Sequence, residues 1–322
     1  MNGCPTQTQK PLVSIVMPAY NVDDYIAQTI ECLLCQTVGD LEILVIDDGS
    51  TDDTSNVVLA CELRDERVRL FRTGNGGPSR ARNIGIDKAN GRYLMFIDSD
   101  DVVAPDFVET LISLLIKYDC QCSACGITTY RGEAAVVSGH HDPIIYDDYS
   151  VKYLALEKPR GFLANKAFLA SLIADKHLRL REDIHQSEDM LFLLDYLSFC
   201  ERAAYVEDIK YFYRQRKGSL TNTLKNENWF DVLTVFEAYK DRFTENPDGS
   251  EAVKRNFLPV AYEGKYRYRA TGIENQNIKR RLKSMLDYCE SSLYDQPLKI
   301  RLKMFFYRHC MSLIMYRRLS YV

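Results

Sequence analysis

Short apolar runs alternate with amphipathic segments along the first hundred residues. The runs have the length of buried parallel strands, and the segments between them place apolar side chains at helical spacing. The expected strands are 12–17, 42–46, 68–71 and 93–97, and the expected helices lie within 23–34, 54–61 and 79–89. This alternation predicts an α/β fold with a mostly parallel sheet and helices on both of its faces.

Beyond about residue 225 the pattern becomes helical. An apolar stripe at helical spacing is formed there by Trp229, Val232, Leu233, Phe236 and Phe243. We therefore expect a catalytic α/β domain over 1–225 and a helical region over 226–322, on the acceptor side or in contact with a membrane or partner.

The chain has 322 residues, of which 46% are hydrophobic, so it can bury a full core. Its formal net charge of -4 argues against nucleic acid as a partner. No export signal and no membrane-spanning run is evident, which makes the cytoplasm the expected location and reduced thiols the expected state of the ten cysteines. Cys120, Cys122 and Cys125 lie in an apolar stretch that predicts a buried strand, so we expect them in the core and not on a metal.

Ligands of such sheets bind beyond the carboxyl ends of the strands, which directs attention to Tyr20, Asp48 and Asp98. Tyr20, in the turn Pro18-Ala19-Tyr20-Asn21, offers a ring on which a base can stack. Asp48 offers an acceptor for a base imide or a ribose hydroxyl. Ordinary turn chemistry and capping of the next helix by Asp47 or Ser50 are the alternatives.

Three carboxylates cluster after the fourth expected strand, in Asp98-Ser99-Asp100-Asp101. They repel one another unless they are solvated, protonated or bridged by a cation. A hard divalent ion such as Mg²⁺ or Mn²⁺ suits oxygen ligands and leaves coordination positions for phosphates. The alternative is a solvated acidic turn.

Arg80 and Arg82 open the third expected helix, after the glycine-rich loop that contains Gly76. Helix N-termini and guanidinium groups both suit anionic ligands. Surface ion pairs are the alternative for such arginines.

Taken together, the motifs resemble a bacterial family 2 glycosyltransferase with the GT-A fold. The resemblance covers roughly the first 220 residues and is carried by 13–21, 47–52, 81–83 and 98–101. It implies inverting transfer from a nucleotide sugar, usually a UDP-sugar, assisted by Mn²⁺ or Mg²⁺. The acceptor it implies is a hydroxyl of a glycan or lipid-linked saccharide in bacterial surface polysaccharide assembly.

The resemblance also assigns residues. It places Asp98 and Asp100 on the metal and Asp189 as general base with Glu188 in support, in the helix that begins near Ser187. The remaining nucleotide-sugar contacts it implies are Pro18, Tyr20, Asn21, Asp48, Gly76, Arg80, Arg82, Asp98, Arg216 and Ser219. From the residues alone, the acidic pair equally suits first-turn compensation of the helix dipole, and the basic loop around Arg216 equally suits a solvated face.

Two other functions fit parts of the pattern. A haloacid-dehalogenase-type phosphatase would use Asp98 as nucleophile and Asp100 as acid and base, but it leaves Tyr20, Asp48 and Arg82 without roles. A non-catalytic sugar-binding protein would keep the fold without the chemistry. The basic and apolar residues of 298–322 suit either peripheral contact with anionic lipid or a helix packed between neighbours.

Overall fold

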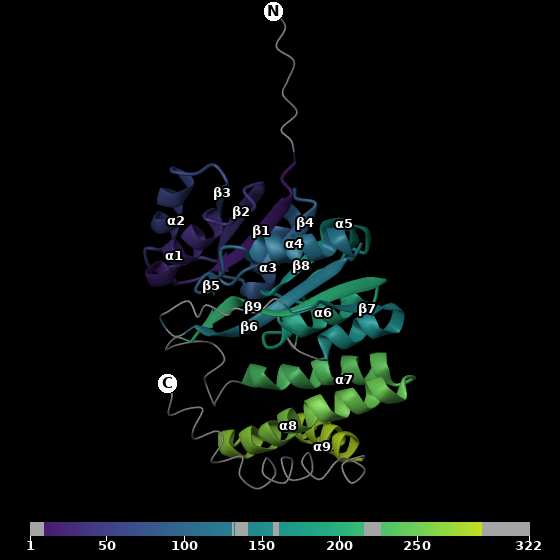
Figure 1. Ribbon diagram of the computed structural model, residues 1–322. Helices are drawn as coiled ribbons and strands as arrows, with labels where there is room; N and C mark the ends of the chain where they lie inside the picture. Colours follow the sequence, from purple (N-terminus) through teal and green to yellow (C-terminus); the bar gives the residue numbers. More distant parts are fainter. Residues whose placement is uncertain (1–9, 131, 133–140, 157–160, 216–226, 292–322) are drawn as a thin grey trace, which may run out of the picture. The chain divides into compact units, whose positions relative to one another are not determined.

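The computed structural model describes residues 10–130, 132, 141–156, 161–215 and 227–291 (Figure 1). The chain divides into two compact units. The first comprises Met1–Glu182 with Phe192–Arg214, and the second comprises Asp183–Leu191 with Gln215–Val322.

A single sheet runs through the first unit (Figure 1). Its strands are β1 (Val13–Ala19), β2 (Leu41–Asp47), β3 (Val68–Arg72), β4 (Tyr93–Phe96), β5 (Val102–Val103), β6 (Cys122–Tyr130), β7 (Ile144–Asp147), β8 (Lys166–Leu169) and β9 (Arg202–Arg214). They follow the order β3-β2-β1-β4-β8-β6-β9-β5, with β7 paired to β9. The first four are parallel neighbours, whereas β8 is antiparallel to both β4 and β6. All four predicted strands are therefore present, and β6 runs in the same direction as β4.

Helices cover both faces of this sheet, as predicted. They are α1 (Asp23–Leu34), α2 (Thr54–Glu62), α3 (Pro78–Lys88), α4 (Phe107–Lys117), the 3-10 helix η1 (Asp148–Ala155), α5 (Ala170–Asp175) and α6 (Glu188–Leu197). Alternate residues of β1, such as Ile15, share one buried core with α1, α2 and α4. On the opposite face a Cβ at Gly85 of α3 would lie 2.2 Å from Val16, so α3 approaches the sheet closely only because glycine stands there. Phe192 of α6 packs edge-on against Phe96 on β4.

The cysteines of the predicted apolar strand lie in the core. Cys122 and Cys125 are fully buried in β6, and Cys120 is buried just before it. Burial raises the pKa of the Cys122 and Cys125 thiols to about 12, so both stay protonated at neutral pH. Their packing role is confirmed.

The second unit is helical, as predicted for the C-terminal region. Its elements are the 3-10 helix η3 (Glu227–Asp231), α7 (Val232–Phe243), α8 (Pro247–Thr271) and α9 (Gln276–Glu290). The predicted apolar stripe is buried, and Phe236 stacks edge-on against Phe257 of α8. Within the described residues no helix is both long and apolar enough to cross a bilayer.

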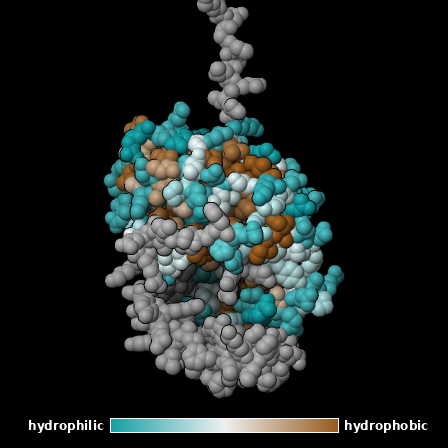
Figure 2. All heavy atoms as spheres, in the orientation of Figure 1, coloured by the Kyte–Doolittle hydropathy of each residue, from teal (hydrophilic) through white to brown (hydrophobic). Residues whose placement is uncertain are grey.

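Figure 2 shows one face of the molecule, on which apolar and polar residues of the described part are interspersed. Large apolar side chains that are exposed come from turns, from helices and, in the case of Ile144, from strand β7. They are Tyr20, Leu59, Leu63, Ile116, Ile144, Phe162 and Phe199. Two of them, Tyr20 and Phe162, lie at the edge of the sheet described next.

Candidate active site

The acidic turn after β4 is held in shape by a buried carboxyl. Asp101 is fully buried, and its two oxygens contact the Arg214 N–H at 2.7 Å and the Tyr211 hydroxyl at 2.5 Å. The Thr29 hydroxyl of α1 contacts the carbonyl oxygens of Ser99 and Asp101 at 3.0 and 2.8 Å. The turn is therefore fixed from β9 and from α1.

Asp101 differs from its acidic neighbours Asp98 and Asp100 in its burial and in its pKa. Burial, followed by the negative charges of Asp98 and Asp100, raises the pKa of Asp101 to about 8, although the hydrogen bonds from Arg214 and Tyr211 oppose the shift. Asp98 and Asp100 are only partly buried. The structural carboxyl is thus Asp101, while Asp98 and Asp100 lie where a ligand can reach them.

Arg82 of α3 reaches the acidic turn. Its Nη2 donates to Asp98 Oδ1 at 2.9 Å, and its side chain is 11% exposed. A surface ion pair does not account for so buried a guanidinium. Two residues of the predicted site, distant in sequence, therefore meet at one end of the sheet.

Asp48 organises the glycine-rich loop before α3. Its carboxylate oxygens accept from the N–H groups of Gly76 and Gly77 at 2.9 and 2.7 Å. Gly77 has a φ of 88°, which favours glycine. A Cβ at Gly76 would lie 2.4 Å from the Cδ of Arg80, so Arg80 lies directly over this glycine. Each Asp48 oxygen keeps a second lone pair and can accept one more hydrogen bond. A hydrogen bond from the nucleotide to Asp48 stays a prediction.

The neighbouring Asp47 has a different partner set. Its carboxylate accepts from the Ser50 N–H at 2.9 Å and from the Ser55 hydroxyl, which holds the turn into α2. Asp47 thus fixes the turn but does not cap the helix, because the N-cap residue of α2 is Asp53, whose side chain makes no cap hydrogen bond within the described residues.

The turn after β1 presents an aromatic ring. Tyr20 is 45% exposed, directly after the buried strand that contains Pro18. Asn21 has a left-handed φ of 50°, and its side-chain oxygen accepts from the Thr51 N–H at 2.8 Å. Asn21 therefore joins the ends of β1 and β2 and supports the position of Tyr20.

Two residues at this edge were not singled out in the sequence. Arg214 donates from Nε to the Asp100 carbonyl oxygen at 2.7 Å, in addition to its backbone contact with Asp101. Ser79, in the first turn of α3, is buried, and its hydroxyl has no hydrogen-bond partner among the residues that the structure describes. The only features that indicate these two residues are that Arg214 ends strand β9 and that Ser79 begins an expected helix.

The predicted acidic pair belongs to the second unit, at the start of α6. Glu188 is buried, whereas Asp189 is partly exposed. The Met190 carbonyl in the same turn accepts from the Tyr239 hydroxyl at 3.2 Å, which ties this turn to α7. Arg216 and Ser219, and the segment 298–322, lie outside the described residues.

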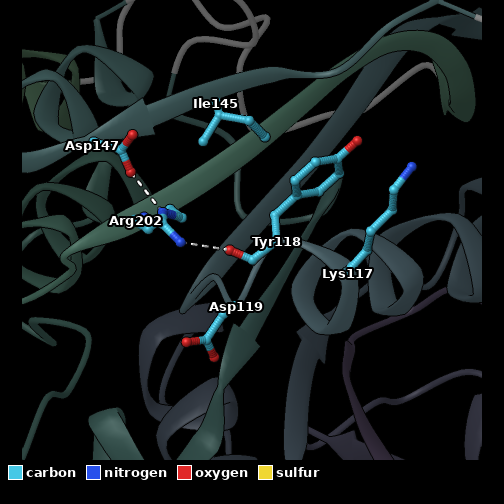
Figure 3. A pocket seen from close by; sticks show the side chains of 6 residues that line it. All are labelled: Lys117, Tyr118, Asp119, Ile145, Asp147 and Arg202. Carbon is cyan, nitrogen blue, oxygen red and sulfur yellow. Dashed lines mark hydrogen bonds and ion pairs between the residues drawn. The ribbon is translucent and has the colours of Figure 1, made fainter.

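A shallow cavity of about 360 Å³ lies at the other edge of the sheet (Figure 3). It is lined by Lys117, Tyr118, Asp119, Ile145, Asp147 and Arg202. The Arg202 guanidinium is occupied there by Asp147 at 2.6 Å and by the Tyr118 carbonyl oxygen at 3.1 Å. Because Arg202 and Asp147 pair with each other and the cavity lies at the amino ends of β6 and β9, we place the candidate site at the carboxyl edge instead.

The carboxyl edge has donor atoms suited to a hard divalent cation. Within the described part of the chain no group of three His, Cys, Asp or Glu side chains gathers at one point. Mg²⁺ sites in proteins, however, commonly use one or two carboxylates and complete the coordination with substrate phosphates and water. Asp98 and Asp100, partly exposed on a rigid turn, fit that requirement.

Comparison with known proteins gives a consistent result. The family model described as glycosyl transferase family 2 matches residues 14–175. Glycosyltransferase GlyG of Streptococcus pneumoniae serotype 4 is 29% identical over 238 residues, which cover 70% of this chain and 78% of that protein.

Two solved structures are similar in fold. S. aureus TarS 1-349 in complex with UDP-GlcNAc has a TM-score of 0.63 at 18% identity, covering 95% of this chain and 90% of that one. The Pyrobaculum calidifontis mannosyltransferase PcManGT, in complex with GDP-Man and Mn²⁺, has a TM-score of 0.56 at 16% identity, covering 97% and 84%.

The fold is the GT-A architecture, which this chain shares with the two solved structures. More narrowly, the chain belongs to glycosyl transferase family 2, whose model spans just over half of its residues. This membership leaves the phosphatase and the non-catalytic alternatives without support.

Proposed function

We propose that the enzyme transfers a sugar from a nucleotide diphosphate sugar, with a UDP-sugar as the favoured donor, to a hydroxyl of a glycan or lipid-linked saccharide. The observation that carries this proposal is the meeting of Asp98 and Arg82 beside the loop that Asp48 holds. Support comes from the nucleotide sugars named for the similar structures, UDP-GlcNAc and GDP-Man.

In this proposal the donor lies along the carboxyl edge. Tyr20 stacks on the base, because its exposed ring follows β1 and is steadied by Asn21. Asp48 and the loop around Gly76 border the nucleoside, and Pro18, near the end of β1, contacts it as well. Arg80 and Arg82, at the start of α3, offset the negative charge of the ligand, as helix N-termini and guanidinium groups do for phosphates.

Asp98 and Asp100 would hold Mn²⁺ or Mg²⁺ with the donor diphosphate. Such an ion, when bound, stabilises negative charge on the departing diphosphate as a Lewis acid. Asp101 keeps the turn in shape through Arg214 and Tyr211, so that the two outer carboxylates stay oriented. Arg216 and Ser219 are proposed as further diphosphate contacts.

Asp189 is the proposed general base. It would remove the proton of the acceptor hydroxyl while that oxygen attacks the anomeric carbon from the face opposite the leaving group, which inverts the anomeric centre. Such bases contribute about 10²–10⁴-fold to rate. Adjacent residues on a helix point in different directions, so the buried Glu188 is assigned to support and the partly exposed Asp189 to the acceptor.

The acceptor and setting are proposed more broadly. A role in bacterial surface polysaccharide assembly would place the enzyme in the cytoplasm, with 298–322 in peripheral contact with the inner face of the membrane. Flotation of the full chain and of a form that ends at residue 297 with anionic liposomes tests that contact. Equal flotation of the two forms would contradict it.

A thermal-shift screen tests the donor class directly. UDP-Glc, UDP-Gal, UDP-GlcNAc and GDP-Man are each tested with Mn²⁺ and with EDTA, because a ligand that binds the folded state raises the melting temperature by mass action. We expect at least one nucleotide sugar to raise it in Mn²⁺. No shift with any donor would contradict the proposed donor class.

A further inference from the structure

Phe162 forms an exposed aromatic surface at the carboxyl edge of the sheet. Its side chain is 47% exposed, whereas Leu163 and Ala164 beside it are buried. Single exposed apolar residues are ordinary on protein surfaces. The position of Phe162 and the way in which its backbone is held distinguish it from the others.

The sheet register places Phe162 at the same end of the sheet as the acidic turn. Met95 of β4 pairs with Ala167 of the antiparallel strand β8, so β8 begins where β4 ends. Residues 161–165, which precede β8, therefore lie at the same end of the sheet as Asp98, which follows β4.

Three neighbouring strands thus carry three features along one edge, in the order β1, β4, β8. Tyr20 follows β1, Asp98 and Asp100 follow β4, and Phe162 precedes β8. The order aromatic ring, carboxylates, aromatic ring matches the order base, diphosphate, sugar in a nucleotide sugar.

A buried ammonium group holds the turn of Phe162. Lys166 is fully buried, and its Nζ donates to the Phe162 carbonyl oxygen and to Asn165 Oδ1, the latter at 3.0 Å. Asn165, also fully buried, donates in turn to the Cys125 carbonyl oxygen of β6 at 2.5 Å. Burying an ammonium group is costly unless it is well hydrogen-bonded, so this arrangement fixes the backbone of Phe162 firmly.

We propose that Phe162 stacks on the sugar ring of the bound donor and that Lys166 positions it by holding its carbonyl group. The apolar C–H face of a pyranose suits the flat, electron-rich face of a phenyl ring. The inference rests on the proposed function, since it places the donor along the same edge.

The test compares a nucleotide sugar with its nucleoside diphosphate. The probe is the nucleotide sugar that the wild type binds most tightly among UDP-Glc, UDP-Gal, UDP-GlcNAc and GDP-Man, titrated calorimetrically in Mn²⁺ beside UDP or GDP. We expect Phe162→Ala to weaken nucleotide-sugar binding about fivefold to tenfold and to change diphosphate binding less than about twofold. Phe162→Tyr should restore most of the affinity, and retained diphosphate binding shows that the variant is folded.

Phe199→Ala is the matched control. Phe199 is 46% exposed but lies before β9, whose first residues pair with the start of β6, at the opposite edge of the sheet. It should leave both affinities unchanged. Equal weakening by Phe162→Ala and Phe199→Ala, or unchanged sugar binding in Phe162→Ala, would overturn the inference, as would an effect confined to the KM of the acceptor.

Lys166→Met tests the positioning role. It should lower nucleotide-sugar affinity in the wild type but add little in the Phe162→Ala background, because both changes act through one ring. Additive losses would overturn the positioning role. A wild type that binds none of the nucleotide sugars would contradict the proposed function itself, and is distinguishable from a silent Phe162 substitution in a wild type that binds one.

Discussion

The Arg82 guanidinium lies 2.9 Å from a carboxylate oxygen of Asp98, with Arg82 almost completely buried. This pair joins the first helical turns of α3 to the end of β4. It also sets the charge at the carboxyl edge, because an arginine at this distance offsets one of the carboxylates to which a cation and a diphosphate would be held.

Arg82→Ala should therefore weaken binding of the nucleoside diphosphate by about tenfold or more. Arg82→Lys should recover only part of the loss, because an ammonium group does not reproduce the planar fork of arginine. Calorimetric titration with UDP or GDP in Mn²⁺ measures both. Arg179→Ala removes an exposed pair with Asp87 and should leave affinity unchanged, so an equal loss in that control would contradict the assignment.

Asp100→Ala should remove most of the gain in diphosphate affinity that Mn²⁺ provides. The reason is that Asp98 and Asp100 are the only two side chains proposed to bind the cation, so loss of either one removes half of the protein's ligands. Affinity is compared in Mn²⁺ and in EDTA. Asp119→Asn, at the opposite edge and with a left-handed φ of 50° that asparagine tolerates, is the control. Equal wild-type affinity in both buffers would show that the metal assignment is wrong.

Asp101→Asn should leave the fold intact, whereas Asp101→Ala should lower the melting temperature. The raised pKa makes the neutral carboxyl the main form at pH 7 without metal. An asparagine amide is neutral as well; its oxygen keeps the acceptor for the Arg214 N–H, and its NH₂ group can donate to the Tyr211 hydroxyl oxygen. The stability that this raised pKa contributes is present at acidic pH and is lost as the pH rises from about 4 through about 8. Denaturant unfolding in EDTA at pH 5 and pH 8 should show this decline in the wild type and its absence in Asp101→Asn. A parallel decline in both proteins would contradict the shift.

Asp189→Asn should slow transfer by about 10²–10⁴-fold while donor affinity changes less than about twofold. An amide cannot accept the proton of the acceptor hydroxyl, although it keeps the shape of the side chain. Product formation is followed by chromatography, and donor binding is followed separately. Asp195→Asn, on the exposed side of the same helix, should transfer at the wild-type rate. Wild-type transfer by Asp189→Asn would remove the base assignment.

The local pattern of the sequence was sufficient for the first half of the fold. Strands β1 to β4 are short, mostly apolar segments between turn residues, and each was predicted within one or two residues. The insertion of β8 between β4 and β6 was not predicted, because antiparallel pairing of Met95 with Ala167 depends on contacts far apart in sequence.

The candidate site was predicted in its residue types but not in its connections. Asp47 and Asp48 are adjacent in one motif, and only the structure assigns the turn to Asp47 and the glycine loop to Asp48. Arg214 and Asp101 are more than a hundred residues apart in the sequence, so no local pattern predicts their contact. Long-range hydrogen bonds of this kind distinguish the buried carboxyl of Asp101 from the partly exposed carboxylates of Asp98 and Asp100.

Arg214 is also the last residue of the first unit, and Gln215 begins the next stretch of the second. Its guanidinium lies 5.1 Å from the ring of Tyr25 and 4.7 Å from that of Tyr130, and its Nη2 donates to Gln28 at 2.6 Å. The carboxyl of Asp101 thus anchors the point at which the polypeptide leaves the sheet. The buried side chain of Asp101 therefore fixes two parts of the chain: the acidic turn at the carboxyl edge and the residue from which the chain continues into the helical unit.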